Sequence, residues 1–381
     1  MKKSIYKEQR EHILQILDHY QCSKFEFSLT EKSNPTPFAT IFSIFIKDLL
    51  NYNFEEEERI FLINYLQSLQ DSETGLFFAD KKYSYTNPFY VKECLQFTTF
   101  SLSALSILGS APRYQIKHNI KSCDDVYSYL DKVGVKDGRL GSGNFAMFLG
   151  IFLSLDKINS RSNFIDNWFE YHNKNFNKQN GFWTSGIKAK SQWSYQNALH
   201  QLIIYEYWDK DTPNHQKSID ITLKNVDKNG TFALLPGGGA CCDYDAVHTL
   251  NLLGVQKNYK SDQIKTIIKD TYSQILSVQD NISFCENNLA YKLSLPKDIN
   301  VFLNKSLLSS IFRIREFIGM KKNKFYHYPH WSNFPIKTYS SDLWSIWFRL
   351  ITIAEIENII IRNQDWKFHE FPGLGILKNK K

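Results

Sequence analysis

The sequence predicts an all-α protein in which six helix pairs form a double ring of inner and outer helices, an (α/α)6 toroid. The main observation is a repeat: an amphipathic helix runs into a polar turn with a glycine, and an aromatic residue follows. The turn glycines or their equivalents recur at intervals of about 40 to 63 residues, the range of two-helix repeats. Its clearest copies are LINYLQSLQDSETGLFF (62–78), WFEYHNKNFNKQNGFWT (168–184), IDITLKNVDKNGTFALL (219–235) and DTYSQILSVQDNISFCE (270–286), and weaker ones are 129–141 and 316–331.

The second observation is that a more apolar helix follows each turn. A helix that is apolar on most faces must be buried on most sides, whereas its partner with a one-sided apolar stripe faces solvent. The glycine in each turn supplies the positive φ that reverses the chain. An open solenoid has the same periodicity and stays an alternative. The predicted inner helices are 91–109, 144–155, 192–208, 243–254, 304–319 and 341–356.

Composition favours one globular domain. The 381 residues are 43% hydrophobic and 15% aromatic, enough for a sizeable core. We expect a single toroid domain over 1–381, with 1–35 as an N-terminal helix and lead-in and 364–381 as a C-terminal tail that closes the sixth unit. The net charge of +7 is scattered, which excludes a basic groove for nucleic acid.

The chain also lacks the marks of export. Its first twenty residues carry charges where a secretory segment is apolar, and no run approaches ~20 uncharged apolar residues. Six cysteines without a CxxC pair favour reduced thiols. A cytoplasmic protein without an integral membrane segment is expected. The motifs for nucleotide hydrolysis, dinucleotide binding, zincin and α/β-hydrolase chemistry are also missing.

The candidate site lies in GGGACCDYDAVHTL (237–250), where carboxylates and a histidine crowd together. In a ring, the N-termini of the inner helices converge on one mouth. Superposing QNALHQL (196–202) on YDAVHTL places Asn197 on Asp245 and His200 on His248. Other helices bring further polar or aromatic residues to a similar level, and the predicted substrate-binding residues are Trp193, Asn197, Glu93, Gln96, Phe97, Asp342 and Trp344.

Two carboxylates in a dry cavity suggest acid chemistry. Asp243 and Asp245 diverge on a regular helix but converge on an extended approach to one, and the glycine-rich entry favours the extended form. Two such groups cannot both ionise at low cost, so one becomes a proton donor. His248 lies three residues beyond Asp245 on its face and is expected to hydrogen-bond it. The alternative is a purely structural role, in which Asp243 or Asp245 caps the helix by accepting hydrogen bonds from its first backbone amides.

The turns QDSETGLF and KQNGFW resemble the glutamine–tryptophan repeats of triterpene cyclases and the turns of protein prenyltransferase β subunits, both (α/α)6 toroids. DYDAVHTL is similar to the Asp-x-Asp-Asp acid motif of class II terpene cyclases, with Ala246 in place of its last aspartate. The resemblance implies a cyclase or isomerase acting on a small-molecule or lipid-like isoprenoid without a cofactor. It implies Asp245 as donor, Asp243 as polarising partner, and His248 or His200 as support.

Three alternatives remain. Protein prenyltransferases bind zinc, and Cys241, Cys242, Asp243, His248 and His200 offer suitable ligand types, although the Asp-x-Cys order is absent. A magnesium ion could accompany a diphosphate. Toroids also host glycan lyases and hydrolases, and KFYHYPHWSNFP (324–335) is rich in groups that stack on sugars. A toroid scaffold that binds another protein is the third.

Overall fold

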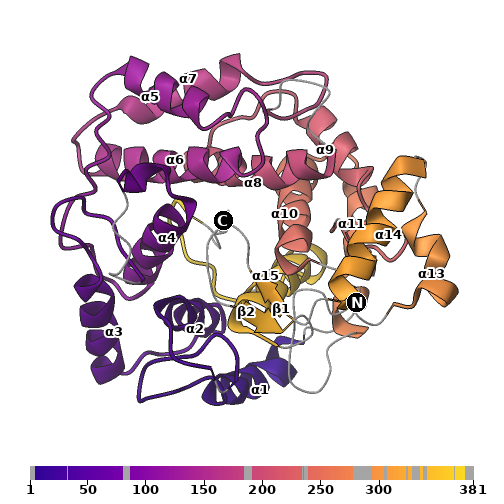
Figure 1. Ribbon diagram of the computed structural model, residues 1–381, viewed down its shortest axis with the longest axis horizontal. Helices are drawn as coiled ribbons and strands as arrows, with labels where there is room; N and C mark the ends of the chain where they lie inside the picture. The colour runs from indigo at the N-terminus through magenta and orange to yellow at the C-terminus, as the bar shows by residue number, and fades with distance from the viewer. Residues whose placement is uncertain are drawn as a thin grey trace.

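The computed structural model shows an almost entirely helical chain arranged around a ring (Figure 1). No helix in the part of the chain that it describes is long and apolar enough to cross a membrane. It describes residues 5–31, 33–79, 86–183, 191–233, 235, 239–277, 293–303, 307–322, 325–327, 335–337, 341–363 and 365–373.

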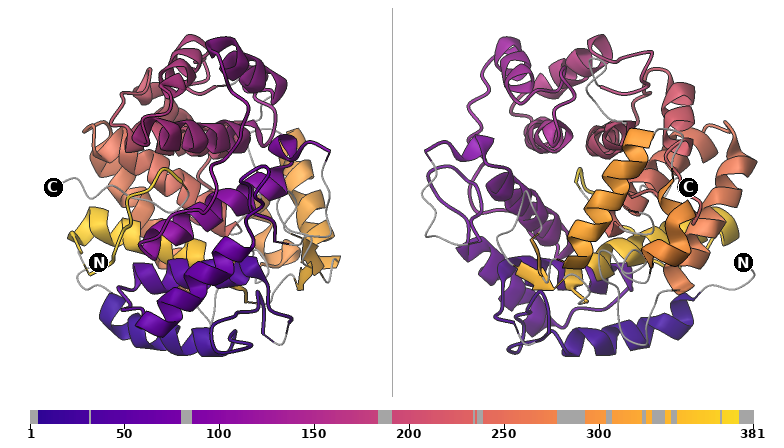
Figure 2. Two further views of the ribbon diagram at one scale, coloured as in Figure 1. Left: turned by 90° about the vertical axis from the view of Figure 1, so that its left-hand side faces the viewer. Right: turned by 45° about the vertical axis from the view of Figure 1, so that its right-hand side comes forward.

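Six inner helices form a closed ring. Each contacts the next one along the chain, and the last contacts the first. This closure confirms the predicted toroid and excludes an open solenoid. Figure 2 shows the same ring from two further sides. The inner helices are α2 (Pro37–Leu49), α4 (Lys92–Ile107), α6 (Ser142–Ile158), α8 (Ser191–Tyr207), α10 (Ala240–Leu250) and α15 (Leu343–Ile361).

In the described chain, six helices form an outer layer around this ring, and α13 and α14, treated below, also lie outside it. Helix α3 packs on α4, α7 on α6 and α5, α9 on α8 and α10, and α11 on α15. A short π-helix, η2 (Asn251–Val255), extends α10, and a 3-10 turn, η1 (Pro88–Tyr90), precedes α4. The outer helices are α1 (Tyr6–Asp18), α3 (Glu56–Ser68), α5 (Cys123–Lys132), α7 (Phe164–Lys174), α9 (His215–Leu223) and α11 (Ser261–Ser277).

The turn glycines of the predicted repeats have the positive φ that reversal of the chain requires. Gly75, Gly138, Gly181 and Gly230 all have positive φ. At Gly75 a Cβ atom would also lie 2.0 Å from the carbonyl oxygen of Gln115, so the turn needs glycine for space as well as for backbone conformation.

The predicted set of inner helices is wrong at one position. Segment 304–319 corresponds to α14 (Leu307–Lys322), which packs on α13 (Leu295–Phe302) outside the ring and shares a small separate core with it. Its apolar residues are not all buried, since Leu307 is 74% exposed. A short antiparallel pair, β1 (Phe325–His327) and β2 (Pro335–Lys337), follows α14.

Helix α2 takes the missing place in the ring. It was overlooked because the turn before it has no glycine; the first glycine of the sequence is Gly75. Other signals start this helix instead: the Thr36 hydroxyl accepts a hydrogen bond from the Ala39 amide at 3.1 Å, and Pro37 occupies the first turn. Residues 38–46 of α2 are all buried, as an inner helix requires.

Candidate functional site

The N-terminal ends of four inner helices meet at one mouth of the ring. The Gly141 amide, at the start of α6, donates to Asn197 Oδ1 of α8 at 3.0 Å. Gln196 Nε2 of α8 donates to Cys242 Sγ of α10 at 2.8 Å. The Lys92 ammonium, at the start of α4, lies 3.8 Å from where a Cβ atom of Gly141 would stand. Asn197 therefore ties α8 to the turn before α6.

Four titratable side chains, which we call the mouth cluster, interact here: Lys92, His200, Cys241 and Asp245. Burial lowers the pKa of Lys92 to about 8, and the nearby Cys241 and Asp245 partly oppose this. Burial and the Lys92 charge lower the pKa of His200 to about 4, so its imidazole is neutral. Asp245 is only 5% exposed. The structure thus brings two of the predicted residues, Asp245 and His200, into one electrostatic cluster.

Lys92 was not predicted, and its surroundings favour an anion. Among the described residues, the charges that act on its ammonium are those of Cys241 and Asp245. Within the part of the chain that the structure describes, no side chain caps the N-termini of α4, α6 or α10, whereas Thr36 caps α2 and Asp342 caps α15. Uncapped helix N-termini carry partial positive charge and attract anions. The sequence feature that could have identified Lys92 is its position as a basic residue at the start of an inner helix.

Asp243 faces away from this cluster. Helix α10 begins at Ala240, so the expected extended entry is wrong, and residues two apart on a helix point in different directions. The fully buried Asp243 carboxylate pairs with Arg349 of α15 and accepts from the Phe232 amide at 2.8 Å. Burial outweighs Arg349 and raises the pKa of Asp243 to about 6.

His248 lies between two glutamates. Its Nε2 is 3.0 Å from Glu206 of α8 and its Nδ1 is 3.0 Å from Glu355 of α15, while Asn251 Nδ2 donates to Glu355 at 2.9 Å. Burial lowers the pKa of His248, but the two carboxylates outweigh it and raise the pKa well above the usual value. Both ring nitrogens face glutamates rather than Asp245, contrary to the expected hydrogen bond. Glu206 and Glu355 were not predicted as partners of His248. Their position as acidic residues inside apolar helices was the sequence feature that could have identified them.

The predicted substrate-binding residues have mixed environments. Asp342 accepts from the Ser345 amide at 2.8 Å and from its hydroxyl at 2.7 Å, which makes it the cap of α15. Glu93 is half-buried, and burial raises its pKa. Gln96 is 2% exposed, and its amide nitrogen has no hydrogen-bond partner among the residues described. The side chain of Trp193 lies outside the described residues.

Aromatic side chains from the middle of α4 and the start of α15 meet across α2. The ring centroids of Phe100 and Trp344 are 6.4 Å apart, and each lies 5.5 Å from that of Phe42. Helices α4 and α15 both contact α2, so these rings join three neighbouring inner helices. Phe97 on α4 is 1% exposed and contacts Phe38 of α2. We call Phe42, Phe97, Phe100 and Trp344 the aromatic wall.

The alternatives receive less support from the geometry. No group of three metal-ligating side chains is placed for an ion within the described ranges. Asp243 and His248 face Arg349 and two glutamates rather than Cys241. Of the segment proposed to stack on sugars, 324 and 328–334 lie outside the described residues.

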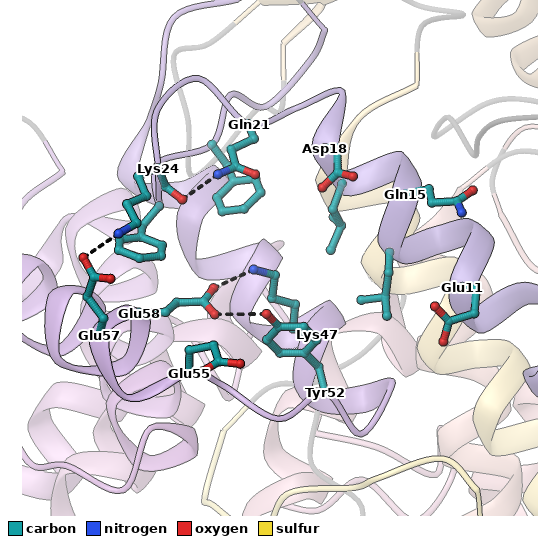
Figure 3. A pocket seen from close by; sticks show the side chains of 14 residues that line it. Glu11, Gln15, Asp18, Gln21, Lys24, Lys47, Tyr52, Glu55, Glu57 and Glu58 are labelled. Atoms are coloured by element: carbon teal, nitrogen blue, oxygen red, sulfur yellow. Dashed lines mark hydrogen bonds and ion pairs between the residues drawn. The ribbon is translucent and has the colours of Figure 1, made fainter.

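A separate polar pocket of about 370 Å³ lies between α1, α2 and α3 (Figure 3). Its lysines already have partners: Lys47 pairs with Glu58 at 2.6 Å and Lys24 with Glu57 at 2.5 Å. No residue of the mouth cluster lines it. The pocket is therefore separate from the candidate site.

Comparison with known proteins adds little. No family model matches the chain, and no curated protein matches it. Among solved structures, the chain is similar to Candida albicans protein geranylgeranyltransferase-I complexed with GGPP. The two share 17% identity with a TM-score of 0.34, over 90% of this chain and 88% of that one. The fold described above rests on the contacts between the helices themselves.

Proposed function

We propose that this chain is an enzyme that acts on an isoprenoid, with the mouth cluster and the aromatic wall as its reacting centre. The observation that carries the proposal is the buried Asp245 carboxyl, which interacts electrostatically with the Lys92 ammonium at the helix N-termini of a ring whose inner helices also carry the aromatic wall. A polar group that can release a proton next to apolar aromatic faces suits a hydrocarbon substrate.

The chemistry best supported is proton-initiated isomerisation or cyclisation. In molecules whose Asp245 carries a proton, its O–H bond breaks and a C–H bond forms at an alkene carbon, which leaves a carbocation and a carboxylate. The Lys92 ammonium stabilises that carboxylate, and the faces of Phe100 and Trp344 stabilise the carbocation.

His200 supplies the base that ends the reaction. Its Nδ1 lies 2.7 Å from the Gln196 carbonyl oxygen and, in a neutral imidazole, must donate to it. Its Nε2 therefore carries a lone pair, which can take a proton from the carbon beside the cation and form a new alkene. Asp243 has no part in this step, because its carboxylate pairs with Arg349.

A second candidate, ionisation of a prenyl diphosphate, is favoured by the Lys92 ammonium and the uncapped N-termini of α4, α6 and α10. There the carbon–oxygen bond breaks and pyrophosphate leaves with the electron pair. Asp245 would then hold a magnesium ion against the diphosphate rather than donate a proton.

The test is incubation of the full chain with prenyl diphosphates, and separately with oligosaccharides, with products followed by mass spectrometry and a pyrophosphate assay. Proton-initiated chemistry gives a product of unchanged mass that keeps its diphosphate, whereas ionisation releases pyrophosphate. Asp245→Asn is expected to lower turnover by about 10²–10⁴-fold, the usual contribution of a general acid. Asp262→Asn, on the exposed surface of α11, is the matched control and should leave turnover unchanged.

Undiminished turnover in folded Asp245→Asn protein would remove Asp245 from the mechanism. Conversion of oligosaccharides but not of prenyl substrates would contradict the isoprenoid proposal and establish the glycan alternative.

A further inference from the structure

Exposed apolar residues gather on α13 and α14. Of the ten large hydrophobic side chains that are exposed in the described chain, five fall between residues 299 and 318. Single exposed apolar residues are normal on a protein surface, but such a concentration marks an interaction surface. The five are Ile299 at 39%, Leu303 at 48%, Leu307 at 74%, Ile311 at 54% and Ile318 at 38% exposure.

On α14 these residues form one stripe. Leu307, Ile311 and Ile318 are spaced by four and seven residues, so they lie within roughly 40° of one another at 100° per residue. The buried face is elsewhere on the helix, where Phe317 packs on Phe302 of α13 with ring centroids 4.6 Å apart. The helix is thus apolar on two sides, and only one side is needed to hold it to the protein.

Basic residues border the stripe. Arg315 and Lys322 are exposed and follow Ile311 and Ile318 by four residues each, which places them along one edge of the stripe. Lys321 is exposed at the same end, and Glu316 is the one acidic residue of the helix. An apolar stripe with a basic border is the pattern of helices that lie in the interface of an anionic membrane.

We propose that α13 and α14 form a docking surface for an anionic lipid membrane, with Leu307, Ile311 and Ile318 inserted among the lipids and Arg315 and Lys322 at the headgroups. The occupant is a membrane rather than a second copy of the chain, because two basic borders would repel each other. The stripe is also aliphatic, without the exposed aromatic anchors typical of protein interfaces. The inference does not depend on the proposed reaction, since binding is measured without substrate.

The experiment is flotation of the full chain with vesicles of phosphatidylcholine alone or with one third phosphatidylserine. The chain should float with the anionic vesicles, and binding should weaken as salt is raised. Leu307→Ser/Ile311→Ser is expected to weaken binding by about tenfold or more, because two apolar side chains lose their burial. Arg315→Glu/Lys322→Glu should remove the preference for anionic vesicles.

Two control variants test whether binding depends on this surface or on exposed apolar and basic residues in general. Ile60→Ser/Ile158→Ser removes two residues that are 49% and 50% exposed elsewhere, and Lys174→Glu/Lys178→Glu makes the same change of charge on exposed residues of α7 and the turn after it. Both should bind like the wild type. Absence of vesicle binding, or equal losses in the control variants, would overturn the proposal. Concentration-dependent dimerisation that Leu307→Ser/Ile311→Ser abolishes would also overturn it, by assigning the surface to a second copy.

Discussion

Asp243 and Asp245 are two positions apart in the sequence but have different partners. Asp243 is fully buried against Arg349, and both charges lie in the wall between α10 and α15. Asp245 interacts with Lys92 across the mouth of the ring. The first pair holds the fold together, whereas the second belongs to the candidate site. The two roles differ because residues two positions apart on a helix point in different directions.

Loss of one member of the buried pair should be costly. Arg349→Met leaves the Asp243 carboxylate without its cation and is expected to lower the free energy of unfolding by about 3–5 kcal/mol. The double variant Asp243→Asn/Arg349→Met, which has no buried charge, should lose less than the single variant. Urea unfolding of the three proteins measures both differences. A double variant less stable than Arg349→Met would contradict the cost assigned to the unpaired carboxylate.

The same pair predicts a dependence on pH. The pKa of Asp243 is raised to about 6 in the folded protein, above its ordinary value, so the folded state binds this proton more tightly. Its contribution to stability is complete below about pH 4 and is lost as the pH rises through 6. Between pH 7 and pH 5 the wild type should therefore gain stability relative to Asp243→Asn. Equal pH profiles for the two proteins would argue against the raised pKa.

Helices α6 and α8 pack closely through Gly143. A Cβ atom there would lie 1.9 Å from the Asn197 carbonyl oxygen, a backbone atom that can move only with its helix. At Gly150 on the same helix, a Cβ atom would meet the flexible Ile204 side chain at 3.0 Å. The contact at Gly143 brings the N-termini of α6 and α8 together and so helps to form the mouth.

This pair of glycines gives a matched test. Gly143→Ala should destabilise the protein by about 1–3 kcal/mol, because the helices must separate, despite the better helix propensity of alanine. Gly150→Ala should stay within about 1 kcal/mol of the wild type, since Ile204 can adjust. Thermal unfolding checks both. Similar melting temperatures for the two variants would contradict the close approach of α6 and α8.

The sequence predicted the elements better than the site. Glycine turns and apolar helices identified five of the six inner helices, because burial on all sides leaves a clear pattern in 144–155 and 341–356. Helix α2 was not predicted as an inner helix because no glycine precedes it. The site depends on which side chains meet across the ring, and no local pattern encodes that Lys92 of α4 faces Asp245 of α10.

One buried carboxylate joins the two terminal segments of the described chain. Glu357 Oε1 accepts from the Ile5 amide and the Tyr272 hydroxyl, each at 2.8 Å. Its Oε2 accepts from Asn363 Nδ2 at 2.9 Å and from Trp366 Nε1 at 2.8 Å. Four donors compensate the burial of this carboxylate. The last inner helix is therefore fastened to α11 and to both terminal segments, which supports closure of the ring.

The closed ring brings Lys92 within electrostatic reach of Asp245, 153 positions later in the chain. The most direct test is NMR titration of the protein with ¹³C-methylated lysines, in which Lys92→Arg assigns the Lys92 signal. Lys92 should titrate near 8 rather than near its ordinary value of 10.5. In Asp245→Asn its pKa should fall further, because the lost carboxylate favoured the charged ammonium. A Lys92 signal that titrates at the ordinary value and ignores the substitution would contradict the account.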